Sequence, residues 1–277
     1  MTGAVPVLTD EEMAAIAGLV YTHTGIRLAP TKTALVTARL QRRLRLHRCA
    51  SFHAYLRHVR HDASGAELRA MLDALTTNQT EFFREREHFG ILTERVLPQL
   101  RTSGATSIAA WSAGCATGEE AYSLAMTLVD GLGSHRKGTI DLLASDICSS
   151  ALAVAARGVF PVDHVRHVPP GVLKRYFERG TGQDLGLARV RREIRRLVHF
   201  EHHNLMEPYP FTRRRDFIWC RNTLMYFDGA ARRRALGHLA DSLVPGGYLF
   251  VSHSEHVHGV APGLERVAPG VYRRSQT

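Results

Sequence analysis

The sequence lacks the long apolar runs of membrane-spanning proteins, the glycine and proline content of fibrous proteins and the paired cysteines of disulfide-rich proteins. Its four cysteines lie far apart and form no Cys-x-x-Cys pair, which excludes a zinc ribbon, a thioredoxin-like motif and a disulfide scaffold. Glycine and proline, at 23 and 11 of 277 residues, are too few for a collagen-like or disordered chain. No apolar run approaches the roughly 20 residues that a membrane-spanning helix needs. We therefore expect a folded protein without membrane insertion.

The first residues carry no basic segment followed by a long apolar stretch, so we expect no secretory signal and a reduced, cytoplasmic setting. Acidic residues are the minority among the charged ones. There are 26 Asp and Glu against 36 Lys and Arg, which gives a net charge of +10. That balance predicts an acidic partner of one of three kinds: nucleic acid, an anionic membrane surface or an acidic protein. At 277 residues the chain is long enough for about two domains.

Residues 1–75 predict a small all-helical domain. Thr9 and Glu12 match a capping box, and apolar residues then recur at helical spacing. No convincing strand pattern appears before residue 100. Helices are expected over residues 13–20, 33–46, 51–61 and 67–75.

The rest of the chain alternates short apolar runs with amphipathic segments, which is typical of βαβ units and a parallel sheet covered on both faces. We therefore expect a doubly wound α/β domain over residues 91–277. Its strands are expected over 108–113, 140–144, 217–220 and 248–252, and its helices over 119–129, 149–157 and 230–243.

One stretch, residues 180–204, interrupts this alternation. Residues 187–191 and 197–200 have the pattern of two short strands around a charged turn. We expect them to pair in a small antiparallel β-subdomain inserted near 180–204.

Ligands of doubly wound folds bind beyond the carboxyl ends of the parallel strands, which nominates residues 112–120, Asp146, 204–205 and 221–222. The first loop, Gly-Cys-Ala-Thr-Gly, matches neither the Gly-x-Gly-x-x-Gly pattern nor a P-loop, so a plain tight turn is the alternative. Asp146 is suited to accept hydrogen bonds from a ribose diol. Its alternative role is to cap the helix expected from residue 149.

A polar segment with the sequence TTNQTEFFRE, residues 76–85, joins the two expected domains. Asn78 and Glu81 fit the start of a helix there. Arg84 would then point from a domain interface, where clefts form, and a surface salt bridge is its alternative role.

Five motifs follow one another along the chain. They are Thr76–Glu85 (TTNQTEFFRE), Trp111–Leu124 (WSAGCATGEEAYSL), Ala144–Ile147 (ASDI), Cys220–Asn222 (CRN) with Tyr226–Asp228 (YFD), and His253–Glu255 (HSE). Together they resemble the bacterial chemotaxis receptor methyltransferase family (CheR) over nearly the whole chain. The resemblance implies a helical N-terminal domain joined to a class I S-adenosylmethionine methyltransferase domain that carries a small β-subdomain.

The implied cofactor is S-adenosyl-L-methionine, with S-adenosyl-L-homocysteine as its product. Carried over by motif, the residues that would line it are Asn78, Thr80, Arg84, Glu120, Asp146, Asn204, Leu205, Arg221 and Asn222. Glu120 would take the amino-acid end and Asp146 the ribose. Arg84 and Tyr226 would lie nearest the transferred methyl and are the catalytic candidates. The linker over residues 76–90 would contribute to this site.

The implied reaction is methyl esterification of glutamates on the cytoplasmic helices of chemoreceptors. A glutamate carboxylate, with a pKa of about 4.3, is already ionised at neutral pH and needs no general base. The enzyme's task is then to desolvate the carboxylate and align it with the methyl group. We expect positioning roles for Arg84 and Tyr226.

The resemblance also supplies a partner for the basic helix. Arg39, Arg42 and Arg43 would dock the acidic helices of a chemoreceptor, and a solvated helix face is the alternative. The β-subdomain would bind a receptor's C-terminal peptide by strand addition in some family members. We expect a monomer.

Two other functions stay open at this point. A nucleic-acid methyltransferase fits the net charge of +10, but the chain has no Asn/Asp-Pro-Pro-aromatic motif and no RNA-binding aromatic cluster, so no nucleic-acid substrate is expected. A non-catalytic cofactor-sensing or receptor-docking module would keep the fold without turnover. The histidines at 202–203, 253, 256 and 258, with Glu255, match no zinc motif, so no metal is expected.

Overall fold

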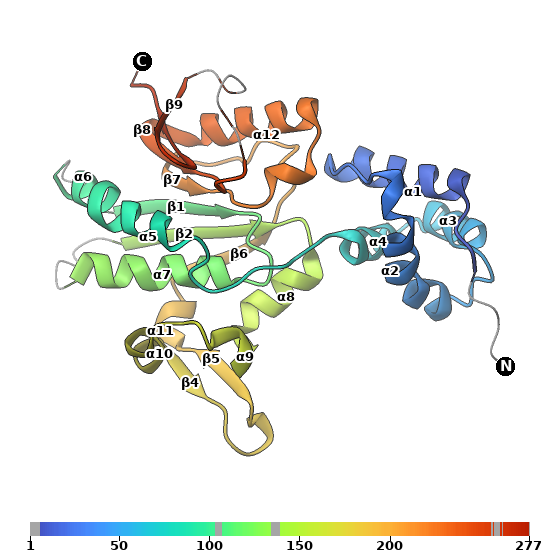
Figure 1. The fold of residues 1–277 in the computed structure, drawn as a ribbon, viewed down its shortest axis with the longest axis horizontal. Helices are drawn as coiled ribbons and strands as arrows, with labels where there is room; N and C mark the ends of the chain where they lie inside the picture. The colour runs from blue at the N-terminus through green and yellow to red at the C-terminus, as the bar shows by residue number, and fades with distance from the viewer. Residues whose placement is uncertain are drawn as a thin grey trace. The chain divides into compact units, whose positions relative to one another are not determined.

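The computed structural model describes residues 6–102, 107–133, 139–255, 257, 261 and 263–276. The chain forms two compact units (Figure 1). The first unit comprises Met1–Thr77 together with Tyr226–Ala231, and the second comprises Asn78–Met225 with Arg232–Thr277.

The first unit is helical. It contains α1 (Asp10–Thr24), the 3-10 turn η1 (Pro30–Lys32), α2 (Thr33–Leu46), α3 (Phe52–His61) and α4 (Ala66–Leu75). Thr9 caps α1 by accepting the Glu12 N–H at 3.2 Å, while the Glu12 carboxylate accepts the Thr9 N–H at 2.9 Å. This is the predicted capping box, and the four predicted helices are confirmed.

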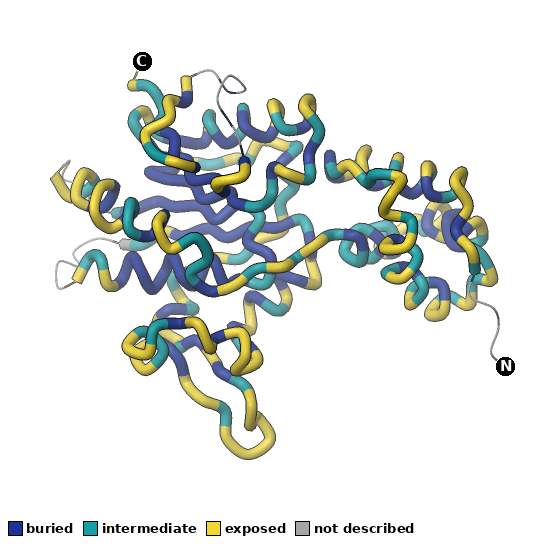
Figure 2. Tube along the Cα trace, in the orientation of Figure 1, coloured by how far each residue is buried: buried dark blue, intermediate teal, exposed yellow. Residues whose placement is uncertain are grey.

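Apolar side chains from all four helices make the core of this unit. The buried residues of these helices are the dark blue parts of the trace in Figure 2. Ile16, Leu40, Phe52 and Met71 are fully buried there. The returning segment 226–231 joins the same unit: Phe227 forms a bridge with Ile26, and the Tyr21 hydroxyl donates to the Asp228 carboxylate at 2.9 Å.

The second unit is built on a seven-stranded sheet. Its strands are β1 (Ser107–Ala113), β2 (Thr139–Asp146), β6 (Val198–His202), β7 (Arg215–Trp219), β8 (Leu243–Phe250), β9 (Leu264–Ala268) and β10 (Val271–Arg274). The order across the sheet is β6-β2-β1-β7-β8-β10-β9. The first five strands pair in parallel, and β10 pairs antiparallel with both β8 and β9. The predicted doubly wound sheet is thereby confirmed, and its antiparallel edge was not predicted.

Helices flank this sheet, with α7 and α12 on opposite faces in Figure 1. The helical elements are α5 (Arg86–Ile91), the π-helical turn η2 (Leu92–Val96), α6 (Leu97–Thr102), α7 (Glu119–Leu132), α8 (Ser149–Arg157), α11 (Arg192–Arg195), the 3-10 turn η5 (Leu224–Tyr226) and α12 (Gly229–Ser242). The predicted helices over 119–129, 149–157 and 230–243 are confirmed. Within the described part of the chain, no helix combines the length and hydrophobicity required to cross a bilayer.

The small antiparallel β-subdomain exists, but its predicted pairing is wrong. Its strands are β3 (Val159–Pro161), β4 (Phe177–Arg179) and β5 (Leu187–Val190), in the order β3-β5-β4, with α9 (Val162–Val165), α10 (Pro170–Tyr176) and the 3-10 turn η4 (Gly182–Asp184) between them. Residues 198–202 instead form β6, which pairs in parallel with β2. The charged stretch taken for a turn is α11, which carries the chain from the small sheet back to the large one. The subdomain therefore spans 159–190 rather than 180–204.

Candidate functional site

The loop after β1 is held in a conformation that requires glycine. Gly114 and Gly118 have φ angles of 85° and 97°, in the left-handed region. A Cβ atom on Gly118 would lie 2.8 Å from the Cβ of Ala155. The N–H groups of Gly114 and Cys115 donate to the Ser145 carbonyl at 2.8 and 2.9 Å, which ties the loop to the end of β2.

Asp146, the last residue of β2, binds this loop from the other side. One of its carboxylate oxygens accepts the Ala116 N–H at 2.9 Å, and the other accepts the Cys148 N–H at 2.8 Å. Its side chain therefore holds both the β1 loop and the start of α8. The predicted alternative of a simple helix cap accounts for only one of these two bonds.

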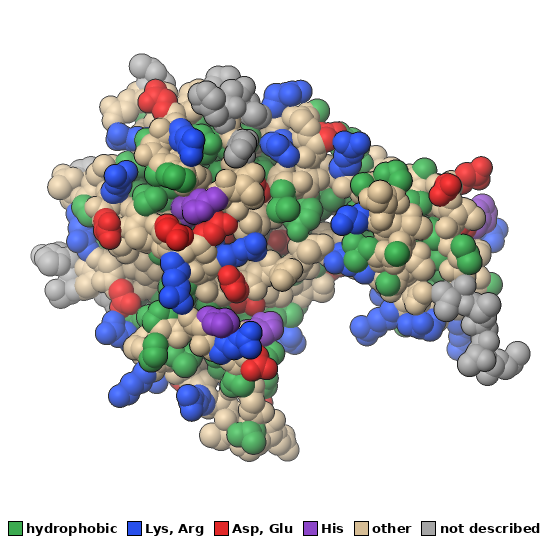
Figure 3. All heavy atoms as spheres, in the orientation of Figure 1, with side chains coloured by type: hydrophobic (Ala, Val, Ile, Leu, Met, Phe, Trp, Pro, Cys, Tyr) green, Lys and Arg blue, Asp and Glu red, His purple; other side chains and the backbone are tan. Residues whose placement is uncertain are grey.

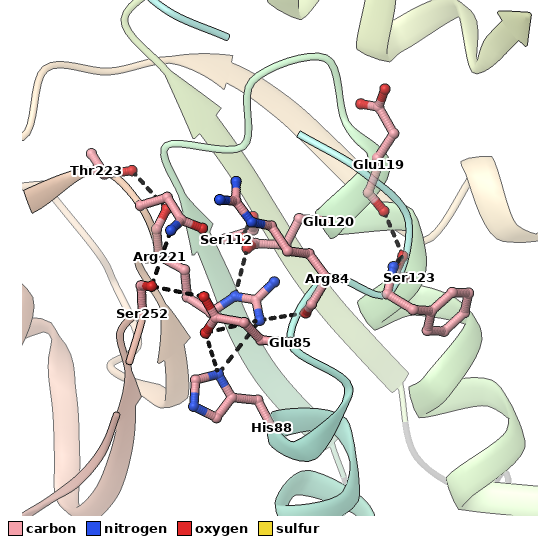
Figure 4. Close-up of polar contacts among 12 residues, drawn as sticks. Arg84, Glu85, His88, Ser112, Glu119, Glu120, Ser123, Arg221, Thr223 and Ser252 are labelled. Carbon is pink, nitrogen blue, oxygen red and sulfur yellow. Dashed lines mark hydrogen bonds and ion pairs between the residues drawn. The ribbon is translucent and has the colours of Figure 1, made fainter. Parts of the chain in front are cut away.

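Glu120, in the first turn of α7, lies in a buried ion pair with Arg221, which follows β7 (Figure 4). Its Oε1 accepts the Ser112 hydroxyl at 2.8 Å, and its Oε2 accepts Nε–H of Arg221 at 3.0 Å. Burial raises the pKa of Glu120, while the Arg221 charge and the Ser112 hydrogen bond oppose that rise.

The Arg221 guanidinium is enclosed by the second unit, with 1% of its side chain exposed. Its Nη1 donates to the Arg84 carbonyl at 2.6 Å and lies 3.8 Å from the Glu85 carboxylate. It also packs over the rings of Phe89 and Trp219. Arg221 thus connects the 76–85 segment, α7 and β7, and its guanidinium is buried within the second unit.

His88 lies next to the Arg221 guanidinium and is fully buried (Figure 4). Burial and the nearby Arg221 charge lower the pKa of His88 to about 4, so its ring is neutral at pH 7. Its Nε2 lies 3.1 Å from the Pro269 carbonyl, and its Nδ1 lies 3.4 Å from Nη1 of Arg221.

The 76–85 segment is extended rather than helical up to Glu81, so the helix predicted to begin at Asn78 is wrong. Asn78 donates to the Cys148 sulfur at 3.1 Å, and the Phe83 N–H donates to the Ser123 hydroxyl at 3.0 Å. Thr80 is half-buried between these anchors. The Arg84 guanidinium points away from Glu85 and His88 in Figure 4, and its Nη1 approaches the Gln79 carbonyl at 3.4 Å.

Glu255, the last residue of the HSE motif, contributes to this site, although the sequence predicted no role for it. Its buried carboxylate accepts the N–H groups of Ser252, Asn222 and Met225 at 2.9, 3.0 and 3.0 Å. Asn222 has a left-handed φ of 55°, and its side-chain amide donates to the Ser252 hydroxyl at 3.0 Å. Glu255 thereby fixes the β7 and β8 loops together. In the sequence, Glu255 is marked by the HSE motif and by its place as a charged residue just after a predicted strand.

Asn204 and Leu205 follow β6 at the same edge of the sheet. The Asn204 side chain accepts the Met206 N–H at 3.1 Å, and the Leu205 carbonyl lies 3.1 Å from Nδ1 of His238. Leu205 is 8% exposed. Six of the nine predicted cofactor residues therefore lie at or follow the carboxyl ends of β1, β2, β6 and β7, while Asn78, Thr80 and Arg84 come from the 76–85 segment. All nine belong to the second unit.

Tyr226 belongs to the first unit, where its carbonyl accepts the Arg27 N–H at 2.9 Å. The basic helix α2 lies in that unit too, and Figure 3 shows Lys and Arg side chains gathered over its end. Arg39 donates to the Leu75 and Thr76 carbonyls at 2.8 Å, so it caps α4. Arg43 pairs with the buried Glu67. Of the three predicted docking arginines, only Arg42 is exposed.

The histidines considered in the sequence as possible metal ligands lie in different surroundings. His203 is half-buried against Trp111 and Tyr209, with ring centroids 5.7 and 5.0 Å away. His253 packs edge-on against His88, and one potential metal-ligating atom from each of His253, His88 and Glu85 lies within 4.8 Å of the other two. Residues 256 and 258 lie outside the described residues.

The arrangement suits a ligand that carries both hydroxyl and ionic groups. Asp146 and Glu120 are buried carboxylates at the strand ends, and Arg84 adds a partly exposed guanidinium. Carboxylates accept hydrogen bonds on both oxygens, and a guanidinium donates several. A nucleoside with an amino-acid tail offers a diol and an ammonium to the two carboxylates, and a carboxylate to the guanidinium.

Comparison with known proteins identifies the chain's relatives. Residues 78–270 match the family model of the CheR methyltransferase SAM-binding domain, and residues 11–76 match that of the CheR methyltransferase all-alpha domain. Chemotaxis protein methyltransferase 2 of Pseudomonas aeruginosa is 40% identical over 265 residues, covering 95% of this chain and 93% of the relative. Chemotaxis protein methyltransferase of Salmonella typhimurium is 41% identical, covering 97% of this chain and 92% of the relative, and that of Escherichia coli is 39% identical, covering 90% and 85%. The chain belongs to the CheR methyltransferase family, whose larger domain binds S-adenosylmethionine.

Proposed function

We propose that this chain transfers a methyl group from S-adenosylmethionine to glutamate side chains on the cytoplasmic helices of chemoreceptors, forming methyl esters for sensory adaptation. The relatives that support this proposal are named chemotaxis protein methyltransferases and are covered over most of their length. The glutamate specificity follows from the resemblance of the motifs around Arg84 and Glu120.

The observation that carries the proposal is the pair of buried carboxylates beside the glycine loop. We assign Asp146 to the ribose hydroxyls, because its side chain is already fixed by the Ala116 and Cys148 N–H groups. We assign Glu120 to the cofactor's ammonium, because Ser112 and Arg221 hold it in one orientation. Pre-organised partners of this kind add affinity because little side-chain freedom is lost on binding.

We assign supporting roles to the other predicted residues. Asn78, Thr80 and Arg84 would come from the 76–90 segment. Asn204, Leu205, Arg221 and Asn222 would come from the loops after β6 and β7. Arg221 would act through Glu120, because its own side chain is enclosed.

The cofactor supplies an electrophilic methyl group when bound. The substrate glutamate is ionised at neutral pH, so no residue of this chain has to remove a proton from it. The chain's contribution is to hold the carboxylate dry and in line with the bond that breaks. Arg84 can hold a carboxylate by charge-assisted hydrogen bonds. The hydrogen bonds from Arg84 to the substrate carboxylate have to be of moderate strength, because binding the ground state too tightly would slow the transfer. The positioning role of Tyr226 rests on the family resemblance alone.

Receptor docking is proposed for the exposed arginines of the α2 end, Arg42, Arg45 and Arg48. Opposite charge on acidic receptor helices would speed and orient the encounter. Arg39 and Arg43 are left out of this surface, because their guanidinium groups bind within the helical unit. A receptor's C-terminal peptide would add to an edge strand, β3 or β4, of the small sheet.

Transfer of tritiated methyl groups tests the proposal. The chain is incubated with labelled S-adenosylmethionine and either a chemoreceptor cytoplasmic fragment or nucleic acid, and the label released by mild base is counted. Volatile methanol released from the receptor is the expected result, because methyl esters hydrolyse in base. Label on nucleic acid, or cofactor binding without any transfer, would contradict it.

A further inference from the structure

Three metal-ligating side chains meet in the helical unit, far from the strands of the second unit in sequence. His47 follows α2, His58 lies on α3, and Glu67 lies on α4. One donor atom from each lies within 4.8 Å of the other two. The imidazole rings of His47 and His58 have centroids 4.3 Å apart, and Nε2 of His47 lies 2.7 Å from Oε2 of Glu67.

Glu67 is fixed before any ligand arrives. Its side chain is 5% exposed, and its Oε1 accepts the Tyr55 hydroxyl at 2.6 Å and Nε–H of Arg43 at 3.0 Å. Burial alone would raise the pKa of Glu67, but its hydrogen bonds to Arg43 and Tyr55 outweigh burial and lower it. The carboxylate is therefore ionised at neutral pH, which a metal ligand requires.

We propose that His47, His58 and Glu67 bind a zinc ion that braces the α2, α3 and α4 helices. Two imidazoles and one carboxylate oxygen are three of the ligands that Zn²⁺ takes in proteins, where sites with three protein ligands leave one position open. Oε2 of Glu67 would ligate the ion, while Oε1 keeps the Tyr55 hydroxyl. Carboxylate ligands of metals are commonly oriented by such outer hydrogen bonds.

Arg43 is the competitor of the metal. Its Nη2 binds Oε2 of Glu67 and lies 3.3 Å from Nε2 of His47. Zinc binding requires the whole Arg43 guanidinium to leave Glu67, because Nε and Nη2 lie in one rigid plane. The Arg43 side chain is 22% exposed, so it can turn toward solvent.

With three protein ligands, water would take the fourth position on the zinc ion.

Zinc binding to the metal-stripped full chain is measured by calorimetry and by the rise in melting temperature. His58→Asn is the main variant, because His58 is exposed and its loss leaves the Glu67 hydrogen bonds intact. His53→Asn is the matched control, since His53 is an exposed histidine of the same helix outside the cluster. A Glu67 variant is avoided because it would also release Arg43 and Tyr55.

We expect one zinc ion per chain with micromolar or tighter affinity, a loss of at least ~10-fold in His58→Asn and in His47→Gln, and no change in His53→Asn. The melting temperature should rise with zinc in the wild type and in His53→Asn only. Equal zinc affinity in His58→Asn and the wild type would overturn the proposal, as would the absence of one-to-one binding by a folded wild-type chain. The result is independent of methyl transfer, which is carried by the other unit's residues.

Discussion

Nε of Arg221 donates to Oε2 of Glu120 across 3.0 Å, and these two side chains are 1% and 9% exposed. Their pairing connects the strand that ends at Trp219 with the helix that begins at Glu119. Because a buried charge is costly without its partner, the pair defines the shape of the candidate cofactor site as well as its charge.

Replacement of Arg221 should therefore act on stability as well as on binding. In Arg221→Met, Glu120 keeps only the Ser112 hydrogen bond, and we expect urea unfolding to show a loss of about 3 kcal/mol. Arg233→Met, at an exposed position of α12, is the control and should change stability by less than ~0.5 kcal/mol. If Arg221→Met is as stable as the control, the ion pair contributes nothing to the free energy of unfolding.

The glycine loop after β1 makes a second prediction. Gly118→Ala forces a side chain into the left-handed region and against Ala155, so it should lower stability by more than ~1 kcal/mol. Gly237→Ala is matched to it, because Gly237 lies within α12 with no atom near its Cβ position, and it should raise stability by roughly 0.5–1 kcal/mol. If both substitutions change the stability in the same direction, this account of the loop is wrong.

Neutral, buried His88 makes stability depend on pH. Its folded pKa of about 4 lies below its ordinary value of 6.5, so the unfolded chain binds more protons in that window and stability falls as the pH falls through it. From pH 7 to pH 5, His88 should account for a loss of about 2 kcal/mol. Urea unfolding of His88→Asn should lack this part of the slope, whereas exposed His53→Asn should keep it. Parallel pH profiles for His88→Asn and the wild type would show that His88 titrates normally.

Asp146→Asn tests the ribose assignment. The substitution removes the charge and turns one acceptor into a donor that faces a backbone N–H, so we expect binding of S-adenosylhomocysteine to weaken by about 1.5–3 kcal/mol. Calorimetry measures the change directly, with Asp163→Asn, an exposed aspartate of α9, as the control. Unchanged affinity in Asp146→Asn would remove Asp146 from the site.

Substitutions of the α2 arginines distinguish residues that dock the receptor from residues that stabilise the fold. Arg42→Glu with Arg45→Glu reverses exposed charges, so the KM for a receptor fragment should rise several-fold while the affinity for S-adenosylhomocysteine stays the same. Arg39→Ala should instead lower the stability of the chain, because Arg39 binds the last carbonyls of α4. If the KM for the receptor fragment does not change in this double variant, Arg42 and Arg45 form only a solvated helix face.

The sequence predicted the elements whose signals are local. The capping box of α1 and the alternation of strands with amphipathic helices required no knowledge of distant contacts. The rule that ligands bind at strand ends nominated Asp146 and the Arg221 loop before any geometry was known. The motif resemblance added the remaining site residues by position.

What the sequence did not predict depends on contacts between distant segments. Strand β6 resembles a hairpin partner of β5 in sequence, and only the crossover by α11 sends it to the large sheet. Arg39 and Arg43 have the spacing of a free basic face, yet the α4 carbonyls and Glu67 bind them from residues more than twenty positions away. Glu255 carries no pattern that separates a backbone-binding carboxylate from a surface one.

The position of the methyl group on a modified receptor is the most direct test of the proposed function. A chemoreceptor cytoplasmic fragment is reacted with this chain and S-adenosylmethionine, digested, and sequenced by mass spectrometry before and after mild base. The account predicts that glutamate side chains gain the mass of one methylene and that base removes it. A base-stable methyl group on another residue type, or an unmodified receptor in the presence of a cofactor-binding chain, would contradict it.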